Sequence, residues 1–217
     1  MRQSTCGEIM GVAVRGKRGP VRPGSRNVVR GQATRQRILR AARGRILAEG
    51  FEALRLDDLA RDAGVTKAAV IKSVGGKARI LLTLGDEDRQ TRLEVIRQEI
   101  ERRTGLRRRL TDVIRRLFDL DVGRMNVVMA YIGYMWFWTG ADHDRAQAMV
   151  NETRVLLCEL IIAASNTRPS PERLRLLSLR ILGGYVIGLR DLRYGHATLD
   201  GSVRFVVGYV LDDRADR

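Results

Sequence analysis

The sequence predicts an all-α protein, and three observations support that class. Apolar residues recur at intervals of about three and four positions through most of the chain after residue 32, which is the spacing of amphipathic helices. Glycines and the segment "NTRPSP" separate these stretches. The period-two alternation of a half-buried strand does not extend over a useful length, although "VRFVVGYV" is β-prone in composition.

The first predicted helix follows a basic arm. Residues 1–31 contain Pro20, Pro23 and scattered glycines and arginines without apolar periodicity, so we expect them to be flexible. A helix should begin near Ala33, with Thr34 as its N-cap, and should end at Gly50.

Two short helices and one long helix come next. The short helices are predicted over 56–63 and 67–74, with Gly64 at the turn between them and Gly75-Gly76 after the second. Lys77 should open a helix that extends to about Arg103. The rest of the chain predicts further helices near 106–122, 124–139, 143–166, 171–194 and 201–213. The predicted organisation is an arm of residues 1–31, a three-helix head of residues 32–77 and a larger helical body of residues 78–217.

The charge of the chain favours an anionic partner. The net charge is +15 and the pI is about 11.1. Residues 1–77 hold 17 lysines and arginines against 6 acidic residues, whereas residues 78–217 hold 23 against 19. This asymmetry is typical of a nucleic-acid-binding head on a nearly neutral body. An abundance of arginine without a binding role is the alternative.

Other classes of protein are disfavoured. Cys6 and Cys158 form no metal or disulfide spacing, which fits a reducing cytoplasm, and no uncharged apolar run has the length of a membrane span. His143 and His196 are isolated, and no hydrolase, phosphate-loop, dinucleotide or zinc-protease motif is present. We therefore expect neither an enzyme nor a metal or other cofactor.

The short helix after Gly64 has features of a DNA-reading helix. Thr66 can cap its first turn, which leaves the positive end of the helix dipole facing outward. Ala68 and Ala69 are small enough for close approach to a major groove, and Lys67, Lys72 and Lys77 can meet phosphates.

At these residues the chain resembles the TetR family of bacterial transcription regulators. The matching series is "TRxRIL", "GF", "LxxLAxxAGVTKxxV" and "GxK" within residues 34–81. The resemblance implies a helix-turn-helix head, a ligand-binding and dimerising body, and a double-stranded DNA operator. Ile71 replaces a usual aromatic and Ser73-Val74 a usual His-Phe pair, so two phosphate contacts of the family are lost, while Arg55 stands near a usual capping residue. The expected DNA-binding residues are Arg35, Arg55, Thr66, Lys67, Ala68, Ala69, Ile71, Lys72, Ser73 and Lys77.

Two segments of the body carry further expectations. The helix near 171–194 is apolar on most faces, and with "VRFVVGYV" it resembles the pair of helices that form the family's dimer interface. An intrachain core is the alternative. The expected interface residues are Leu177, Ile181, Gly184, Tyr185, Gly188 and Phe205.

The second segment, "AYIGYMWFWTG", concentrates aromatic side chains, which predicts a pocket for an apolar or cationic small molecule or, alternatively, ordinary core packing. The expected ligand-binding residues are Phe118, Met125, Tyr131, Tyr134 and Trp138. The sequence thus predicts a homodimeric regulator, a repressor released from a palindromic operator by its ligand. Two alternatives stay open: a basic DNA-binding protein of the same fold without an effector, and an all-α enzyme that uses the body cavity.

Overall fold

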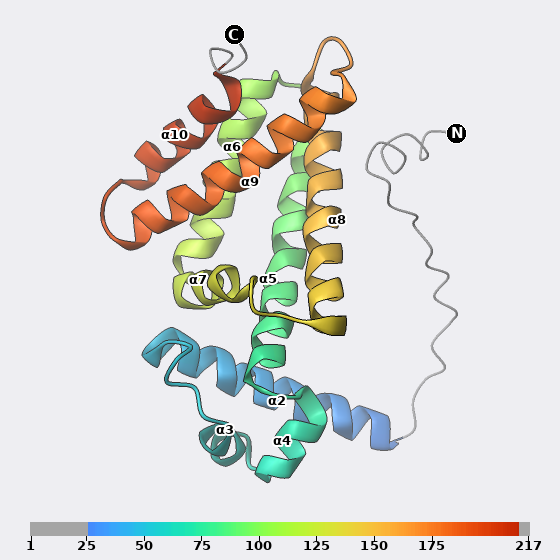
Figure 1. Cartoon of the computed structure of the whole chain (residues 1–217), viewed down its shortest axis with the longest axis vertical. Helices are drawn as coiled ribbons and strands as arrows, with labels where there is room; N and C mark the ends of the chain where they lie inside the picture. Colours follow the sequence, from blue (N-terminus) through green and yellow to red (C-terminus); the bar gives the residue numbers. More distant parts are fainter. Residues whose placement is uncertain (1–25, 213–217) are drawn as a thin grey trace. The chain divides into compact units, whose positions relative to one another are not determined.

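The computed structural model of the chain describes residues 26–212, and the regular structure in that range is entirely α-helical (Figure 1). The helices in chain order are α2 (Arg26–Glu49), α3 (Leu56–Ala63), α4 (Lys67–Val74), α5 (Lys77–Ile100), α6 (Leu106–Val122), α7 (Met125–Tyr134), α8 (Gly140–Ala164), α9 (Pro171–Arg193) and α10 (Leu199–Leu211). The all-α prediction is confirmed, and the β-prone segment is part of α10.

The described chain divides into two compact units. The head unit holds residues 26–88 and 126–146, and the body unit holds residues 89–125 and 147–212. The boundary predicted near Lys77 marks the start of α5, whereas the head unit continues along that helix to Asp88 and also includes α7. The aromatic segment therefore belongs to the head unit rather than to the body.

The core of the head unit forms where α2, α3 and α4 pack on one another. Buried aliphatic side chains from each helix meet there, including Ile38 and Ile46 of α2, Leu59 of α3 and Val70 of α4. The first turns of α5 add further buried leucines to the same cluster. Their spacing of three and four residues is why these three segments fold as amphipathic helices.

In the body unit α10 packs against both α6 and α9 (Figure 1). Glycine makes one close approach possible: a Cβ on Gly188 of α9 would lie 2.7 Å from Cζ of Phe118 on α6. The Phe118 ring, fully buried, stacks on Tyr185 with centroids 4.7 Å apart. The small residues of α9 are therefore used inside the chain.

The helix ends test the rules used on the sequence. The bounds of α3, α4 and α6 agree with the prediction, and Gly50, Gly64 and Gly75 all have positive φ at helix ends. The first helix was placed wrongly, because α2 begins at Arg26 and Thr34 lies inside it. Gly31 costs a helix interior only about 1 kcal/mol, which flanking helical residues can outweigh. Residues 26–31 of the expected flexible arm are thus helical, and the rest of the arm lies outside the described residues.

A second difference concerns the segment after α7. The predicted helix over 124–139 ends at Tyr134, and residues 135–139 form a turn in which the Phe137 amide donates to the Tyr134 carbonyl at 2.9 Å. Helix α8 then begins at Gly140, which has a φ of 55°. Among residues 26–212, none of the helices combines the length and the hydropathy that crossing a membrane would require.

Candidate nucleic-acid interface and aromatic pocket

The turn between α3 and α4 has the geometry of a helix-turn-helix. Gly64 ends α3 in the left-handed conformation at φ 62°, and the Val65 amide donates to the Ala60 carbonyl at 2.9 Å. Thr66 then caps α4, since its side-chain oxygen accepts from the Ala69 amide at 3.1 Å. The predicted cap is confirmed, and it leaves the amino end of α4 free of a carboxylate in its first turn.

Helix α4 buries one face and exposes the other. Val70 and Val74 are buried against the head core, whereas Lys67, Ala68, Ile71 and Lys72 are exposed. Ala69 and Ser73, also in the predicted set, are half-buried at the edge of that face. The outward face therefore carries small side chains at the start of the helix and a lysine in each turn.

Salt bridges hold α3 in place beside this helix. Arg45 of α2 donates to Asp62 at 2.5 Å and lies 3.7 Å from Asp58. The hydrogen bond from Arg45 lowers the pKa of Asp62 below its ordinary value. Lys67 pairs with Asp57 at 3.0 Å, so this lysine has a partner within the chain before any phosphate approaches.

Arg35 of the predicted set bridges α2 and α4. Its Nη1 donates to the Ser73 carbonyl at 2.8 Å, close to the end of α4, where a cation is favoured by the helix dipole. The side chain also lines a groove of about 540 Å³ that α2 and α4 form together. Arg30 and Lys72 line the same groove, so three basic residues surround it. Arg30 lies in the part of α2 that the sequence had assigned to the arm.

Arg55 and Lys77 behave differently. Arg55 occupies the N-cap position of α3, is exposed and makes no side-chain capping bond there. The Lys77 ammonium donates to the Glu52 carbonyl at 2.9 Å and lies 4.7 Å from the centre of the Phe51 ring. Lys77 is thereby engaged in holding the turn between α2 and α3, a contact that the motif did not predict.

The aromatic segment packs against the first turns of α5. A Cβ on Gly85 would lie 2.0 Å from the Tyr131 ring, so the absence of a side chain there admits that ring. Trp138 is buried, and its centroid lies 5.2 Å from Tyr131 and 5.8 Å from Tyr134. Tyr131 and Trp138 are thus packing residues of the head unit, as the core alternative predicts.

An open pocket remains on the outer side of this cluster. It has a volume of about 430 Å³ and is lined by Phe51, Glu52, Met129, Ala130, Tyr134 and Phe137, among others. Only Tyr134 of the predicted ligand-binding set lines it. Phe51 and Glu52 were missed because they lie in a turn far away in sequence, although the "GF" motif and the run of aromatics both signalled the region.

The two other predicted ligand-binding residues lie in the body unit. Phe118 is fully buried between Tyr185 and Gly188, and Met125 is half-buried at the start of α7. Packing accounts for the contacts of Phe118.

Most of the predicted dimer residues are buried within the body unit. Leu177, Ile181, Gly184 and Gly188 are buried within the chain. Val206 of α10 lies close to both glycines, and Phe118 of α6 lies close to Gly188. Tyr185 is half-buried and donates to Asp121. Of the predicted set only Phe205 is well exposed.

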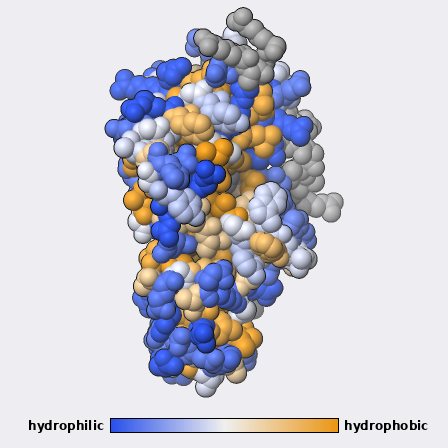
Figure 2. Space-filling model, turned by 60° about the vertical axis from the view of Figure 1, so that its left-hand side comes forward, coloured by the Kyte–Doolittle hydropathy of each residue, from blue (hydrophilic) through white to orange (hydrophobic). Residues whose placement is uncertain are grey.

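A different apolar surface of α9 and α10 faces outward. It comprises Leu179, Val186, Ile187, Phe205 and Tyr209, and the last two rings are stacked with centroids 6.0 Å apart. Figure 2, turned toward this side, shows apolar side chains interspersed with hydrophilic ones. We call these five residues the α9–α10 face.

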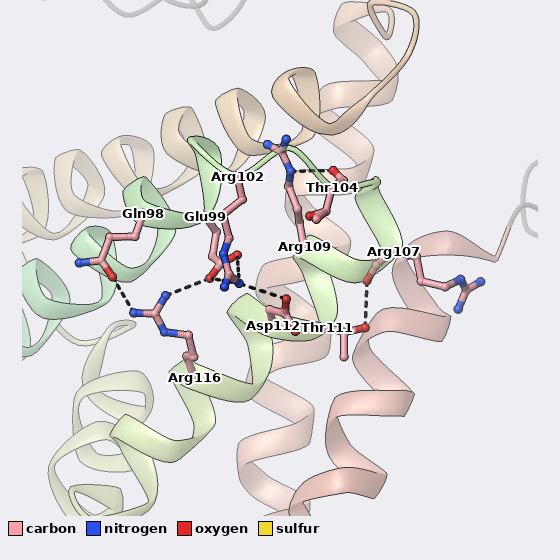
Figure 3. Close-up of polar contacts among 9 residues, drawn as sticks. All are labelled: Gln98, Glu99, Arg102, Thr104, Arg107, Arg109, Thr111, Asp112 and Arg116. Carbon is pink, nitrogen blue, oxygen red and sulfur yellow. Dashed lines mark hydrogen bonds and ion pairs between the residues drawn. The ribbon is translucent and has the colours of Figure 1, made fainter.

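Polar clusters in the body unit connect helices to one another. The buried Glu99 of α5 accepts from Arg102 at 3.2 Å and from Arg116 of α6 at 2.9 Å (Figure 3). Arg109, also buried, donates to the carbonyl of Ile100, the last residue of α5, and to the carbonyl of Thr104 in the following turn. Each charge has a partner on the adjacent helix, as a structural network requires. Within residues 26–212 no group of acidic, histidine and cysteine side chains could hold a metal ion.

Comparisons with known proteins identify the architecture. No protein-family model and no curated protein sequence matches the chain. Among solved structures, the FadR regulator of Bacillus subtilis in complex with stearoyl-CoA is similar with a TM-score of 0.63 and 18% identity, over 82% of this chain and 97% of that one. The fatty acid degradation regulator FadR of Bacillus halodurans gives 0.62 and 16%, over 92% and 99%. AibR, in complex with isovaleryl coenzyme A and operator DNA, gives 0.59 and 18%, over 81% and 96%. A transcriptional regulator of the TetR family from Thermus thermophilus, PfmR, gives 0.59 and 17%, over 81% and 97%. The chain therefore has the fold of the TetR-family transcription regulators.

Proposed function

We propose that this protein is a ligand-responsive transcription regulator that binds double-stranded DNA as a dimer. The observation that carries the proposal is the capped helix α4, whose outward face presents Ala68 and Lys72 while Val70 and Val74 anchor it to the head core. A helix held in this way, with small residues near its amino end, can enter a major groove.

The remaining contacts in the proposal go to phosphates. Lys72, Arg30 and Arg35 surround the groove between α2 and α4, which suits a sugar-phosphate backbone that runs past α4. Lys67 would exchange its salt bridge with Asp57 for a phosphate. Arg55, exposed at the start of α3, would replace the capping side chain of the related motif.

A dimer would place two heads on two half-sites of a palindromic operator. The α9–α10 face supports a two-fold contact, since it is apolar and lies on neighbouring helices. Two copies of α4 would then read half-sites about 34–36 Å apart or a multiple of that spacing.

The response to a ligand is proposed from the fold. The related structures include one with stearoyl-CoA and one with isovaleryl coenzyme A and operator DNA. In this chain a ligand would favour one arrangement of the heads over another, and a coupling of about 1–3 kcal/mol would change operator affinity roughly 5–150-fold. Repression, with release by the ligand, is the proposed direction.

Selection of bound sequences from a random DNA pool at physiological salt tests the proposal. We expect a palindromic motif from the full-length protein, and the same motif at lower affinity from a variant that starts at Gln32, which lacks the arm and the first residues of α2. If neither protein enriches a motif and binding falls steeply with salt, the chain is a non-specific DNA-binding protein of the same fold.

A further inference from the structure

We propose that the open pocket between the α2–α3 turn and α7 binds a small organic cation with an apolar or aromatic portion. The pocket, defined above by Phe51, Glu52, Met129, Ala130, Tyr134 and Phe137, lies wholly within the head unit. Its volume of about 430 Å³ is in the usual range of small-molecule sites, roughly 300–1,000 Å³.

The aromatic rings form adjoining walls rather than a stack. Tyr134 meets Phe51 edge-on, with centroids 5.6 Å apart and planes at 74°, and meets Phe137 at 5.7 Å and 53°. Rings that meet at such angles lie in different planes, and all three of these residues line the pocket. Phe137 is 71% exposed and Trp136 is 84% exposed in the same turn, yet only Phe137 lines the pocket. One of the two exposed aromatic rings is thus placed as a wall.

The chemistry of these walls favours a positive charge. Aromatic faces carry partial negative charge and attract ammonium groups. The Lys77 ammonium already lies 4.7 Å from the Phe51 centroid without lining the pocket, so the rings left for a ligand cation are those of Tyr134 and Phe137. Glu52 is the acidic residue of the pocket, and within residues 26–212 its carboxylate forms no ion pair or hydrogen bond with another residue. A cation would find aromatic surface and an available countercharge together.

The position of the pocket connects it to helices α3 and α4. Phe51 and Glu52 belong to the turn that joins α2 to α3, and Lys77 ties that turn to the first residue of α5. The opposite wall comes from α7 and the turn after it. A ligand that contacts both walls would therefore favour one position of α3 and α4 relative to α7. This regulatory consequence rests on the proposed function, whereas binding of the cation does not.

Benzyltrimethylammonium is a suitable test ligand, and neopentylbenzene is its neutral isostere. Isothermal titration calorimetry on the full chain should detect the cation and show at least about fivefold weaker binding of the isostere. Phe137→Ala should weaken binding of the cation about five- to tenfold, and Glu52→Gln about fivefold. The matched controls are Trp136→Ala, in the same turn, and Glu101→Gln, an exposed acid of the body unit, each of which should change binding less than about twofold.

The outcomes separate this inference from the proposed function. Equal binding of the cation and the isostere, or equal losses from Phe137→Ala and Trp136→Ala, would overturn the cation site. Selection of a palindromic DNA motif would still stand in that case. If the cation binds as expected but leaves the affinity for the selected DNA unchanged at fixed salt, the coupling to the head is overturned.

Discussion

Single residues decide how closely the helices of the head unit approach. The Tyr131 ring occupies the space that a side chain on Gly85 would fill, at a distance of only 2.0 Å from the missing Cβ. Both sides of this contact are constrained, because Gly85 lies inside α5 and the ring also packs against Trp138. A methyl group at position 85 would therefore displace the ring.

Gly85→Ala should destabilise the protein by about 1–3 kcal/mol, as overpacking of a core does. Gly44→Ala is the matched control, because Gly44 lies inside α2 with nothing within 4 Å of its missing Cβ. That substitution should stabilise the protein by roughly 0.5–1 kcal/mol, since alanine favours a helix interior. Chemical denaturation measures both. If Gly85→Ala lowers the free energy of unfolding by no more than the size of the change that Gly44→Ala causes, the Tyr131 ring moves away at little cost.

Local rules predict the structural roles of some residues and not of others. Thr66 and Gly64 were predicted in their roles, because a cap and a left-handed turn depend on the neighbouring backbone alone. The partners of Arg35 and Lys77 depend on segments that are 38 and 25 positions away in the chain. No sequence spacing indicates that both side chains end on backbone carbonyls.

The helices show the same division: apolar periodicity predicts that a segment is helical, but not which of its faces packs against the rest of the chain. The apolar period of α9 predicted a helix with several buried faces, and Leu177 and Ile181 are indeed buried. The assignment of those residues to a dimer contact stays a prediction, although the chain itself already buries them and α10 packs on α9. A helix that is apolar nearly all round does not reveal which face meets its own chain, so Leu179 and Val186 on the exposed face were missed.

A buried polar contact joins three helices of the body unit. Asp121 of α6 accepts from Arg92 of α5 at 2.9 Å and from the Tyr185 hydroxyl of α9 at 2.7 Å. Burial, and then the Asp121 carboxylate, raise the pKa of Tyr185 well above its usual value. The folded protein therefore keeps a proton that the unfolded chain releases above about pH 10, so this residue makes stability fall as the pH rises past that value.

Tyr185→Phe should cost about 1.5–3 kcal/mol near neutral pH, because it removes a hydrogen bond to a carboxylate. It should also reduce the loss of stability between about pH 9 and pH 11, since the phenylalanine releases no proton. Urea denaturation across that range gives both quantities. Tyr194→Phe, at an exposed ring, is the control that should keep the alkaline loss. A Tyr185→Phe variant with the alkaline loss of the parent would show that other groups cause it.

At the scale of the whole molecule, the net charge of +15 should make the proposed DNA affinity sensitive to salt. Lys72→Gln should lower the slope of log affinity against log salt by about 0.9, the value for one lost phosphate contact. Arg107→Gln removes the same charge from an exposed position of the body unit and should leave the slope nearly unchanged. Fluorescence anisotropy on the selected operator between about 50 and 200 mM salt measures both slopes. Equal slopes for the two variants would mean that Lys72 contributes only to the overall positive electrostatic potential of the protein and not to a specific phosphate contact.

The proposed dimer depends on which apolar side chains are exposed. Val186 is 37% exposed at the α9–α10 face, and Val122 of α6 is 49% exposed outside it. Val186→Arg should raise the dissociation constant of the dimer about 100-fold or more, because a two-fold contact would bury two guanidinium groups without partners. Val122→Arg introduces the same charge and should leave the dimer intact. Analytical ultracentrifugation over a range of concentrations measures the association.

The same pair of variants connects assembly to DNA binding. A dimer gains affinity because its second head binds at the high effective concentration set by the first, so the Val186→Arg monomer should lose most of its preference for a palindrome over a single half-site. The Val122→Arg protein should keep that preference. If Val186→Arg remains dimeric, the subunits meet through another surface. If it becomes monomeric yet still prefers the palindrome to the half-site, the two heads do not depend on this contact to act together.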